Sequence, residues 1–406
     1  MLKVYVCGPT VYNDVHIGNL RPILTMDLIL KAARNLKIDF FFVHNITDID
    51  DKIIQQAIKN QWSEVEISKK YAQNYLELLK ILKVDTISKL EYVTENLDVI
   101  ENFILKLSKL GHTYQKNGNV YFNVLKNQNN YGIVSNQKIS HMIFDEEKSE
   151  FKEFAADFVL WKDTNIGVKY PSVFGFGRPG WHTECAALID KNFNGTEIDI
   201  HGGGMDLTFP HHENENIQYW AATNNNITKE WIRNGQINLK GQKMSKSLQN
   251  IILAKDFLNQ YSGDHLKLIF LLNSLTSSIN IDDNLLNNVD VLLARIKKIF
   301  FLKHLNNSSS DFDFKQHQQA MQFLYQRQFS HFNKFINDLI KNINLYKNCN
   351  DINLLCKIFK DLAFDVADFN YQSHLSTYHQ WQSLLQEKNY EQADLLRAEL
   401  LRLKLI

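Results

Sequence analysis

The strongest constraint on the fold is an alternation of strand and helix signals in the first half of the chain. Residues 3–7 and 39–46 are short runs rich in apolar side chains, and a segment with helical periodicity at 20–36 separates them. A nearly continuous apolar run is typical of a parallel strand that is buried on both faces. The pattern predicts a doubly wound, Rossmann-like parallel α/β sheet that binds ligands at the carboxyl ends of its strands.

The rest of this half continues the alternation, interrupted by an insertion at about 95–175. Within the insertion, 125–155 is polar and irregular, and the Lys-Asn-Gly sequence at 116–118 is typical of a hairpin turn. Pro210 is typical of the first turn of a helix. The expected elements are helices at 62–82, 97–109 and 210–222, a hairpin at 112–124 and a strand at 198–200.

From about residue 284 onward the strand signals disappear and amphipathic helical patterns replace them. These patterns cover 289–304, 316–345, 353–367 and 390–405. We therefore expect a Rossmann-like domain over 1–235, a connecting region over 236–284 and an all-α helical domain over 285–406.

Composition excludes several classes of protein. The 406 residues include 45 Lys and Arg against 45 Asp and Glu, which excludes a strongly basic, histone-like chain. No apolar run approaches the ~20 residues that a membrane-spanning helix needs. The first residues read as a strand, not as a signal peptide. Because four cysteines make no disulfide framework in a chain of this size, we expect a cytoplasmic protein without a membrane partner.

Two short motifs suit the binding of phosphate. His16-Ile-Gly-Asn19 lies between the first strand and the first helix, where a helix N-terminus offers N–H groups to an anion. Far downstream, Lys243-Met-Ser-Lys246-Ser places two lysines and two hydroxyls in a polar stretch that suits a triphosphate. Taken singly, the first motif could be a plain helix start and the second a solvated basic loop. Together, and in this order, they resemble the signature pair of the class I aminoacyl-tRNA synthetases.

Two cysteines, one histidine and one glutamate form a candidate metal site. Cys7 ends the first strand, Cys185 follows a Trp-His-Thr-Glu sequence, and His211 and Glu215 are four residues apart, which places them on one helix face. Thiolate, imidazole and carboxylate together make a plausible zinc-binding set. By spacing alone, the histidine at 212 and the glutamate at 213 remain rival ligands, and a lone cysteine is often a buried apolar residue.

The phosphate motifs and the candidate metal site occur together in one family, because the chain resembles the cysteinyl-tRNA synthetases. The matching segments run collinearly from residue 5 to residue 247, and the helical region matches only loosely. The matching segments are YVCGPTVY (5–12), NITDIDDK (45–52), DFVLWK (157–162), GRPGWHTEC (177–185), DIHGGG (199–204), FPHHENE (209–215) and KMSKS (243–247). Relative to the common pattern of the family, the chain is slightly shortened at both ends.

The resemblance implies one Zn²⁺ per chain, which binds the thiol of the substrate L-cysteine and is held by Cys7, Cys185, His211 and Glu215. A hydrophobic pocket distinguishes near-isosteric amino acids by only about 1–3 kcal/mol. Zinc ionises a coordinated thiol and forms a Zn–S bond that the serine hydroxyl cannot match. We therefore expect no editing domain.

The same resemblance implies that Thr47, Trp181 and His201 line the cysteine pocket. The alternatives are that Trp181 is an ordinary core residue and that Thr47 caps the helix after its strand. Glycines at 202–204 would allow the adenylate to approach the backbone closely. The residues implied to contact ATP are Gly8, Thr10, His16, Gly18, Gly203, Asp206 and Lys246.

The implied reaction has two steps. The carboxylate of cysteine attacks the α-phosphate of ATP, and the terminal ribose hydroxyl of cysteine tRNA then attacks the resulting adenylate. His16 would contact the α-phosphate, and Lys243 and Lys246 would hold the β- and γ-phosphates together with Mg²⁺. Asn19 stands where the family usually has a second histidine, and it can still donate a hydrogen bond to phosphate.

The resemblance also assigns roles to the later regions. Residues 236–284 would carry the lysine-rich loop and contact the tRNA stem, and 285–406 would bind the anticodon region of tRNA. We expect a monomer. Two alternatives remain: a paralogous ligase that transfers activated cysteine to an amino-sugar glycoside, and a non-catalytic, zinc-containing RNA-binding paralogue. Cysteine-dependent pyrophosphate exchange and tRNA charging would distinguish the three.

Overall fold

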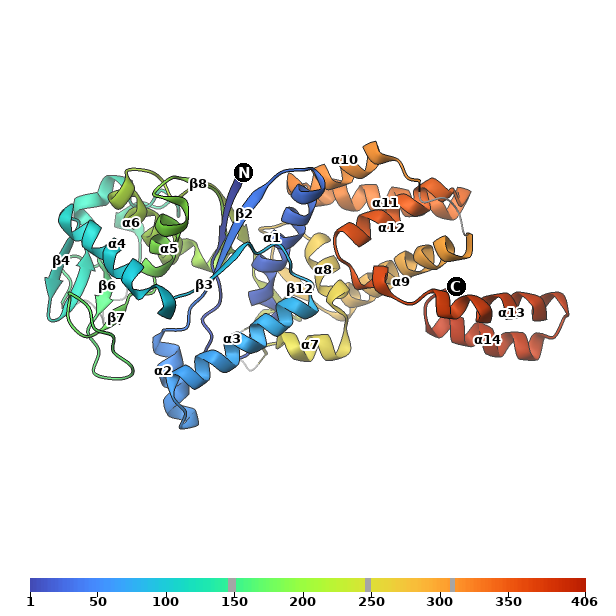
Figure 1. The fold of residues 1–406 in the computed structure, drawn as a ribbon, viewed down its shortest axis with the longest axis horizontal. Helices are drawn as coiled ribbons and strands as arrows, with labels where there is room; N and C mark the ends of the chain where they lie inside the picture. The colour runs from blue at the N-terminus through green and yellow to red at the C-terminus, as the bar shows by residue number, and fades with distance from the viewer. Residues whose placement is uncertain (145–150, 245–249, 307–310) are drawn as a thin grey trace. The chain divides into compact units, whose positions relative to one another are not determined.

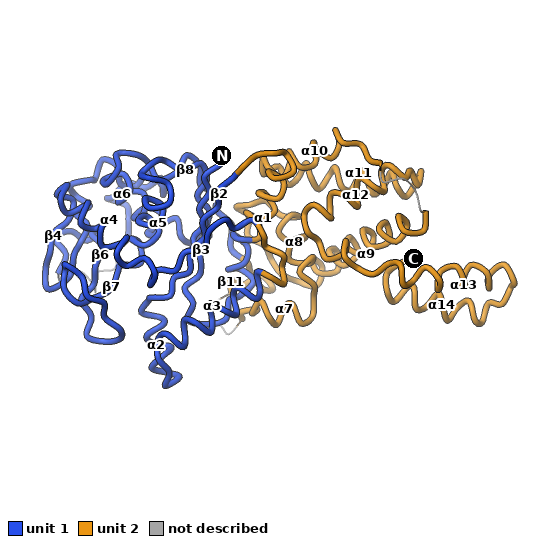
Figure 2. Tube along the Cα trace, in the orientation of Figure 1, with its two compact units in different colours: residues 1–23, 40–79, 86–236 blue, residues 24–39, 80–85, 237–406 orange. Residues whose placement is uncertain are grey.

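The computed structural model describes residues 1–144, 151–244, 250–306 and 311–406 (Figure 1). The chain divides into two compact units (Figure 2). The first unit comprises Met1–Ile23, Phe40–Leu79 and Thr86–Gln236, and the second comprises Leu24–Asp39, Lys80–Asp85 and Ile237–Ile406. None of the helices in these described residues is both long and apolar enough to cross a membrane.

A five-stranded sheet forms the centre of the first unit, and every neighbouring pair of its strands is parallel. The strand order is β3-β2-β1-β8-β9. These strands are β1 (Leu2–Val6), β2 (Phe40–Ile46), β3 (Lys89–Tyr92), β8 (Ile198–Gly204) and β9 (Thr228–Asn234). The predicted doubly wound parallel sheet is confirmed. The direction of winding reverses between β1 and β8, and ligands of such sheets bind at the carboxyl ends of the strands beside this point.

Strand β1 lies between β2 and β8 in the sheet, and its carboxyl-terminal side chains are buried. Val4, Tyr5 and Val6 expose none of their surface, as expected for a central parallel strand. Tyr5 pairs with His201 of β8, and the backbone N–H of Cys7 donates to the carbonyl of Gly202 at 3.1 Å. This last bond fixes Cys7 beside the carboxyl end of β8.

Helices connect the strands of this sheet. The helices that begin in the first unit are α1 (Ile17–Asn35), α2 (Asp51–Asn60), α3 (Glu64–Ile81), α4 (Leu97–Lys109), α5 (Thr183–Phe193) and α6 (Glu213–Thr223). Helix α6 follows an irregular π-helical turn at Thr208–His212, so Pro210 lies before the regular helix instead of opening it. Strand β8 continues through the glycines to Gly204, beyond the predicted end at 200, because these residues pair with β9.

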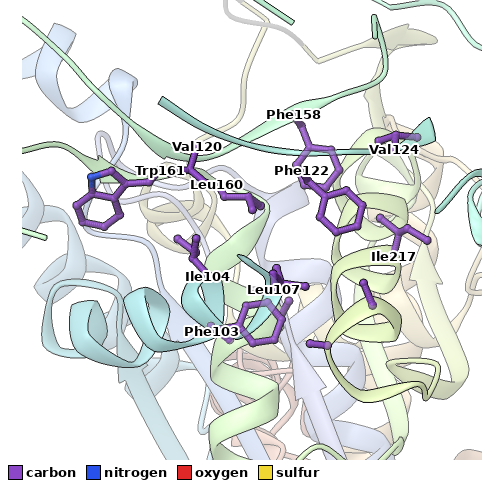
Figure 3. Packing of buried hydrophobic residues seen from close by; sticks show 14 of the residues in the cluster. Phe103, Ile104, Leu107, Val120, Phe122, Val124, Phe158, Leu160, Trp161 and Ile217 are labelled. Carbon is purple, nitrogen blue, oxygen red and sulfur yellow. The ribbon is translucent and has the colours of Figure 1, made fainter. Parts of the chain in front are cut away.

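The insertion contains a four-stranded antiparallel sheet, in the order β4-β5-β6-β7. The strands are β4 (Thr113–Lys116), β5 (Asn119–Phe122), β6 (Phe158–Lys162) and β7 (Arg178–Pro179). The first two form the predicted hairpin. Figure 3 shows how Phe122 and Leu160 of this sheet pack toward Ile104 and Leu107 of α4 and Ile217 of α6. The shared core therefore anchors the insertion to helix α6, which also carries candidate ligands.

The second unit contains a three-stranded sheet in the order β11-β10-β12. Its strands are β10 (Ile237–Leu239), β11 (Gln242–Lys243) and β12 (Ile279–Ile281). The later helices are α7 (Ala254–Gln260), α8 (Gly263–Leu271), α9 (Asp283–Asn306), α10 (Phe314–Tyr325), α11 (Phe329–Tyr346), α12 (Cys349–Asp361), α13 (Leu375–Gln386) and α14 (Tyr390–Arg402). In the described part of 284–406 the regular elements are all helical, as predicted.

The single helix predicted at 316–345 is wrong. Helices α10 and α11 divide this segment, because Arg327 adopts the left-handed conformation with a φ of 61°. The N–H groups of Arg327 and Gln328 donate back to the carbonyls of Leu324 and Phe323 and so end α10. No glycine or proline marks this break, and the apolar periodicity continues on both sides of it.

Candidate metal centre and substrate site

The structure brings the four predicted metal ligands together in the first unit. Cys7 follows β1, Cys185 lies in the first turn of α5, His211 lies in the turn before α6, and Glu215 lies in the first turn of α6. One donor atom from each residue lies within 4.8 Å of all the others. Residues that are far apart in the chain therefore meet at the carboxyl ends of β1 and β8.

The spacing of these donor atoms suits a small, soft cation. The Sγ of Cys7 is 3.9 Å from the Sγ of Cys185, 3.8 Å from the Nε2 of His211 and 3.5 Å from the Oε1 of Glu215. Zn–S bonds of about 2.3 Å and Zn–N bonds of about 2.0 Å in a tetrahedron separate such donors by about 3.5–3.8 Å. The Nε2 of His211 and the Oε1 of Glu215, at 2.7 Å, form a direct ion pair here. The donor set therefore fits zinc in its chemistry, and the three distances from Cys7 fit it in their spacing.

Buried opposite charges compensate one another in this cluster. Burial acts to raise the pKa of Glu215, but the facing His211 and His201 hold that pKa well below its usual range. Burial acts to lower the pKa of His211, and Glu215 raises it well above its usual value. Burial and the neighbouring Cys7 raise the pKa of the Cys185 thiol. A buried carboxylate of this kind needs a cationic partner, which a divalent metal ion would supply.

A second, overlapping set of donors contains His201 and His212 together with Cys7 and Glu215. The Nε2 of His212 is 3.8 Å from the Sγ of Cys7, the same distance as that of His211. His211 also lies 3.9 Å from the Sγ of Cys185, whereas His201 faces the Oε2 of Glu215 at 2.9 Å without hydrogen-bond geometry. Both histidines of the pair at 211–212 thus face the cluster, and only His211 contacts both sulfurs.

Trp181 stands beside this cluster. Its ring centroid is 4.4 Å from that of His211, and 39% of the residue is exposed, so it is not a core residue. The ammonium group of Lys52 lies 5.7 Å from the ring centroids of Trp181 and Tyr12. Trp181 therefore offers an apolar surface next to the candidate metal ligands.

The hydroxyl of Thr47 is held by two buried neighbours. It donates to the Oε1 of Glu184 at 2.6 Å and accepts from the Nδ2 of Asn45 at 3.3 Å. A hydroxyl has one proton and two acceptor lone pairs, so Thr47 retains one acceptor position and no donor. The cap of α2 is Asp50, whose carboxylate accepts from the N–H of Lys52, so Thr47 does not cap that helix.

Two of the glycines predicted to contact ATP, Gly8 and Gly203, are packed closely against the protein itself. A Cβ atom at Gly8 would lie 1.5 Å from the carbonyl oxygen of Asn45, and one at Gly203 would lie 2.8 Å from the Nε2 of His212. Thr10 pairs with Thr47 through an isolated parallel bridge. The exposed Asp206 lies in the short 3₁₀ helix Met205–Leu207, which follows β8.

The first phosphate motif lies at the start of α1. The N–H of Gly18 donates to the Nδ1 of His16 at 3.1 Å, and the N–H of His16 donates to the Oδ1 of Asn19 at the same distance. These bonds place the remaining imidazole proton of a neutral His16 on Nε2, on the other side of the ring. In the second motif, Lys243 is an exposed residue of β11 in the second unit, and Lys246 lies outside the described residues.

Comparison with known proteins decides the family. Residues 1–291 match the family described as tRNA synthetases class I (C) catalytic domain. The chain is 41% identical over 405 residues to a cysteine–tRNA ligase of Mesomycoplasma hyopneumoniae (strain 232), covering 98% of this chain and 96% of that protein. The chain belongs to the cysteinyl-tRNA synthetase family. Members of this family are class I aminoacyl-tRNA synthetases, and the chain is an enzyme of that class.

Other relatives agree with this family. A cysteine–tRNA ligase of Mycoplasma mycoides subsp. mycoides SC is 38% identical over 425 residues, covering 98% of this chain and 95% of that protein. Among solved structures, a LeuRS of Agrobacterium radiobacter K84 has a TM-score of 0.67 at 9% identity and covers 90% of this chain and 84% of its own. A methionyl-tRNA synthetase of Mycobacterium tuberculosis has a TM-score of 0.62 at 12% identity and covers 89% of this chain and 90% of its own. These two structures share the fold of the cysteinyl-tRNA synthetase chain.

Sequence reasoning missed two polar residues of this cysteinyl-tRNA synthetase site, Glu184 and His182. Both lie inside the matching segment 177–185, between Trp181 and Cys185. In the sequence, only their position next to a candidate ligand could have pointed to these two residues. A polar residue at such a position is equally compatible with an exposed helix start. Only the fold shows that Glu184 is buried against Thr47.

Proposed function

We propose that the chain activates L-cysteine with ATP to cysteinyl-adenylate and transfers the cysteinyl group to the 3′-terminal ribose of cysteine tRNA, while a zinc ion selects the substrate thiol. The observation that carries this proposal is the convergence of Cys7, Cys185, His211 and Glu215 at the switch point of the sheet. The end-to-end match to cysteine–tRNA ligases supports the same reaction.

Among the rival ligands, His211 is favoured over His212 because it approaches both sulfur atoms and the carboxylate. Glu213 is excluded as a ligand by its other contacts: its carboxylate accepts from the N–H groups of Gly132 and Ser135. Bound zinc would supply a soft Lewis acid that ionises the thiol of cysteine and discriminates against serine.

The other pocket residues would orient the amino acid. Because Thr47 keeps only an acceptor position, it suits the ammonium group of cysteine and not its carboxylate. The exposed face of Trp181 would cover the short side chain. His201, buried within β8, would contact the amino acid on the side of Glu215.

The nucleotide would be held by the two signature motifs. The Nε2 of His16, on the ring side not used by Gly18, would donate to the α-phosphate as its charge grows in the transition state. Lys243 and Lys246 would hold the β- and γ-phosphates, with Mg²⁺ bound to ATP, while Asn19 supports the His16 backbone. The carboxylate of cysteine attacks the α-phosphorus, and pyrophosphate leaves.

The proposal includes cysteine tRNA, ATP and L-cysteine as partners, a cytoplasmic location and a monomeric chain. Residues 236–284 would contact the tRNA stem and residues 285–406 its anticodon region. RNA binding through phosphates requires only a local basic face, which the zero net charge permits.

Two assays on one purified sample test the proposal. Cysteine-dependent exchange of pyrophosphate into ATP, together with charging of a cysteine tRNA transcript, is the expected result. Exchange without charging would favour transfer of cysteine to an amino-sugar glycoside, a reaction that the matched relatives do not favour. Neither activity would favour an RNA-binding paralogue and would contradict the proposal.

A further inference from the structure

His182 lies directly behind the candidate ligand His211. It precedes α5 at the N-cap position, and its Nδ1 is 3.1 Å from the Nδ1 of His211. Its backbone carbonyl accepts from the Nε2 of Gln218 at 3.0 Å, and the ring of Phe158 meets its imidazole edge-on at a centroid distance of 5.8 Å. Gln218 of α6 therefore fixes the backbone of His182, and Phe158 of β6 packs against its ring.

The contact between the two imidazoles has only one consistent assignment of protons when His211 binds a metal. The Nε2 of His211 faces the sulfur atoms of Cys7 and Cys185, so a metal in this cluster would take the Nε2 lone pair. The proton of His211 must then be on Nδ1. Two ring nitrogens at 3.1 Å share a single proton, so the Nδ1 of His182 must be the acceptor.

We propose that His182 is a positioning residue for zinc: it accepts the Nδ1–H of His211 and thereby fixes the tautomer and the ring orientation that present Nε2 to the metal. This inference rests on the proposed zinc site and deepens it. A ligating histidine usually donates its second N–H to a carboxylate, a backbone carbonyl or water. Here the acceptor is an imidazole.

The choice of a neutral acceptor has a physical reason in the charge of the site. Two thiolates and one carboxylate, from Cys7, Cys185 and Glu215, already carry more negative charge than a divalent ion neutralises. A further carboxylate behind His211 would add a fourth buried negative charge, which is costly in a site of low dielectric constant. A neutral ring nitrogen orients His211 without that cost.

Two polar substitutions distinguish this role from simple packing. In His182→Asn the amide oxygen can occupy the place of the imidazole Nδ1, whereas in His182→Gln it falls near the place of Nε2, away from His211. We expect His182→Asn to retain the zinc affinity of the unmodified chain. We expect His182→Gln to lose roughly 10–100-fold in affinity, the usual effect of removing an outer partner of a metal ligand.

The affinity for zinc is measured on the full chain by competition with a chromophoric chelator, and thermal unfolding of each metal-free variant is recorded in parallel. His317→Leu is the matched control, because His317 is also a buried histidine but pairs with Asp361 in the second unit. We expect this control to lower thermal stability and to leave zinc affinity unchanged. Cobalt-loaded His182→Gln should also show shifted visible absorption bands relative to the unmodified chain.

Equal zinc affinity in the unmodified chain and in His182→Gln would overturn the inference while leaving the proposed function intact. Equal losses in the Asn and Gln variants would also overturn it, since packing and not the acceptor would then be responsible. An unmodified chain that holds no zinc would overturn the inference and the proposed zinc site together.

Discussion

Buried polar groups have different roles in the two units of the molecule. In the second unit two buried charged groups are paired within the fold: the ammonium group of Lys267 donates to the carbonyl of Ala363, and the carboxylate of Asp264 accepts from the N–H groups of Asp365 and Val366. These bonds tie α8 to the turn after α12. They satisfy the buried charges without any external partner.

In the first unit, several buried polar atoms without a hydrogen-bond partner lie close together. Tyr5 Oη, His201 Nδ1 and His212 Nδ1 have no hydrogen-bond partner within the described part of the chain, and His201 Nε2 faces Glu215 Oε2 at 2.9 Å without hydrogen-bond geometry. The ring of His201 is 5.3 Å from that of Tyr5 and 5.1 Å from that of His212, so these atoms form one cluster. Isolated unsatisfied atoms elsewhere are ordinary, whereas a cluster beside a sheet switch point indicates a ligand.

The largest expected effect comes from removing a sulfur donor in the first unit. Cys185→Ser should abolish zinc binding and cysteine-dependent pyrophosphate exchange, with a loss well beyond the roughly 100-fold typical of outer-sphere changes. Zinc content and exchange rate are the measurements. Cys356→Ser is the control, because Cys356 is equally buried but lies on α12 of the second unit. Retained metal and normal exchange in Cys185→Ser would show that this cysteine is not a ligand.

The second prediction concerns the distant phosphate motif. Lys246→Ala should slow adenylate formation by roughly 100-fold, because it removes a charge that stabilises the leaving pyrophosphate. The affinity for L-cysteine should remain nearly unchanged, since the metal cluster is intact. Pre-steady-state adenylate formation and equilibrium cysteine binding separate the two effects. A large loss of cysteine affinity would contradict the assigned role.

A smaller effect is expected from the buried partner of Thr47. Glu184→Gln can reverse the hydrogen bond, because its amide donates to the Thr47 hydroxyl and frees that proton to point toward the substrate ammonium group. We expect the KM for cysteine to rise at least about 10-fold, since a hydrogen bond to a charged group contributes ~1.5–3 kcal/mol. The KM for ATP should not change. An equal rise in both KM values would indicate a general structural defect.

The smallest effect tests the pairing in the second unit. Burial acts to raise the pKa of Asp361, but hydrogen bonds from His317 and Lys357 lower it below its usual value of 3.8. Because the folded-state pKa is depressed, the carboxylate stabilises the fold above about pH 4 and loses this effect as the pH falls through the lowered pKa. Unfolding of Asp361→Asn should therefore be less sensitive to acid than that of the unmodified chain. Parallel pH curves would contradict this pairing.

Much of the fold and of the candidate site could be predicted from the sequence, but not all of it. Apolar runs and collinear motifs predict the parallel sheet and place Cys7 and His201 at its edge. Residue spacing alone could not decide whether His211 or His212 is the metal ligand. In the structure, the irregular turn before α6 directs both rings to the cluster. The contact between Glu184 and Thr47 joins residues 137 positions apart, and side-chain direction at that range depends on tertiary packing.

The most direct test of the central claim is X-ray absorption at the zinc edge of the loaded chain, with and without L-cysteine. We predict two sulfur donors, from Cys7 and Cys185, in the free protein and three when L-cysteine is added. L-serine should leave the spectrum unchanged. A sulfur count that does not rise with L-cysteine would contradict the claim that the metal centre recognises the substrate thiol.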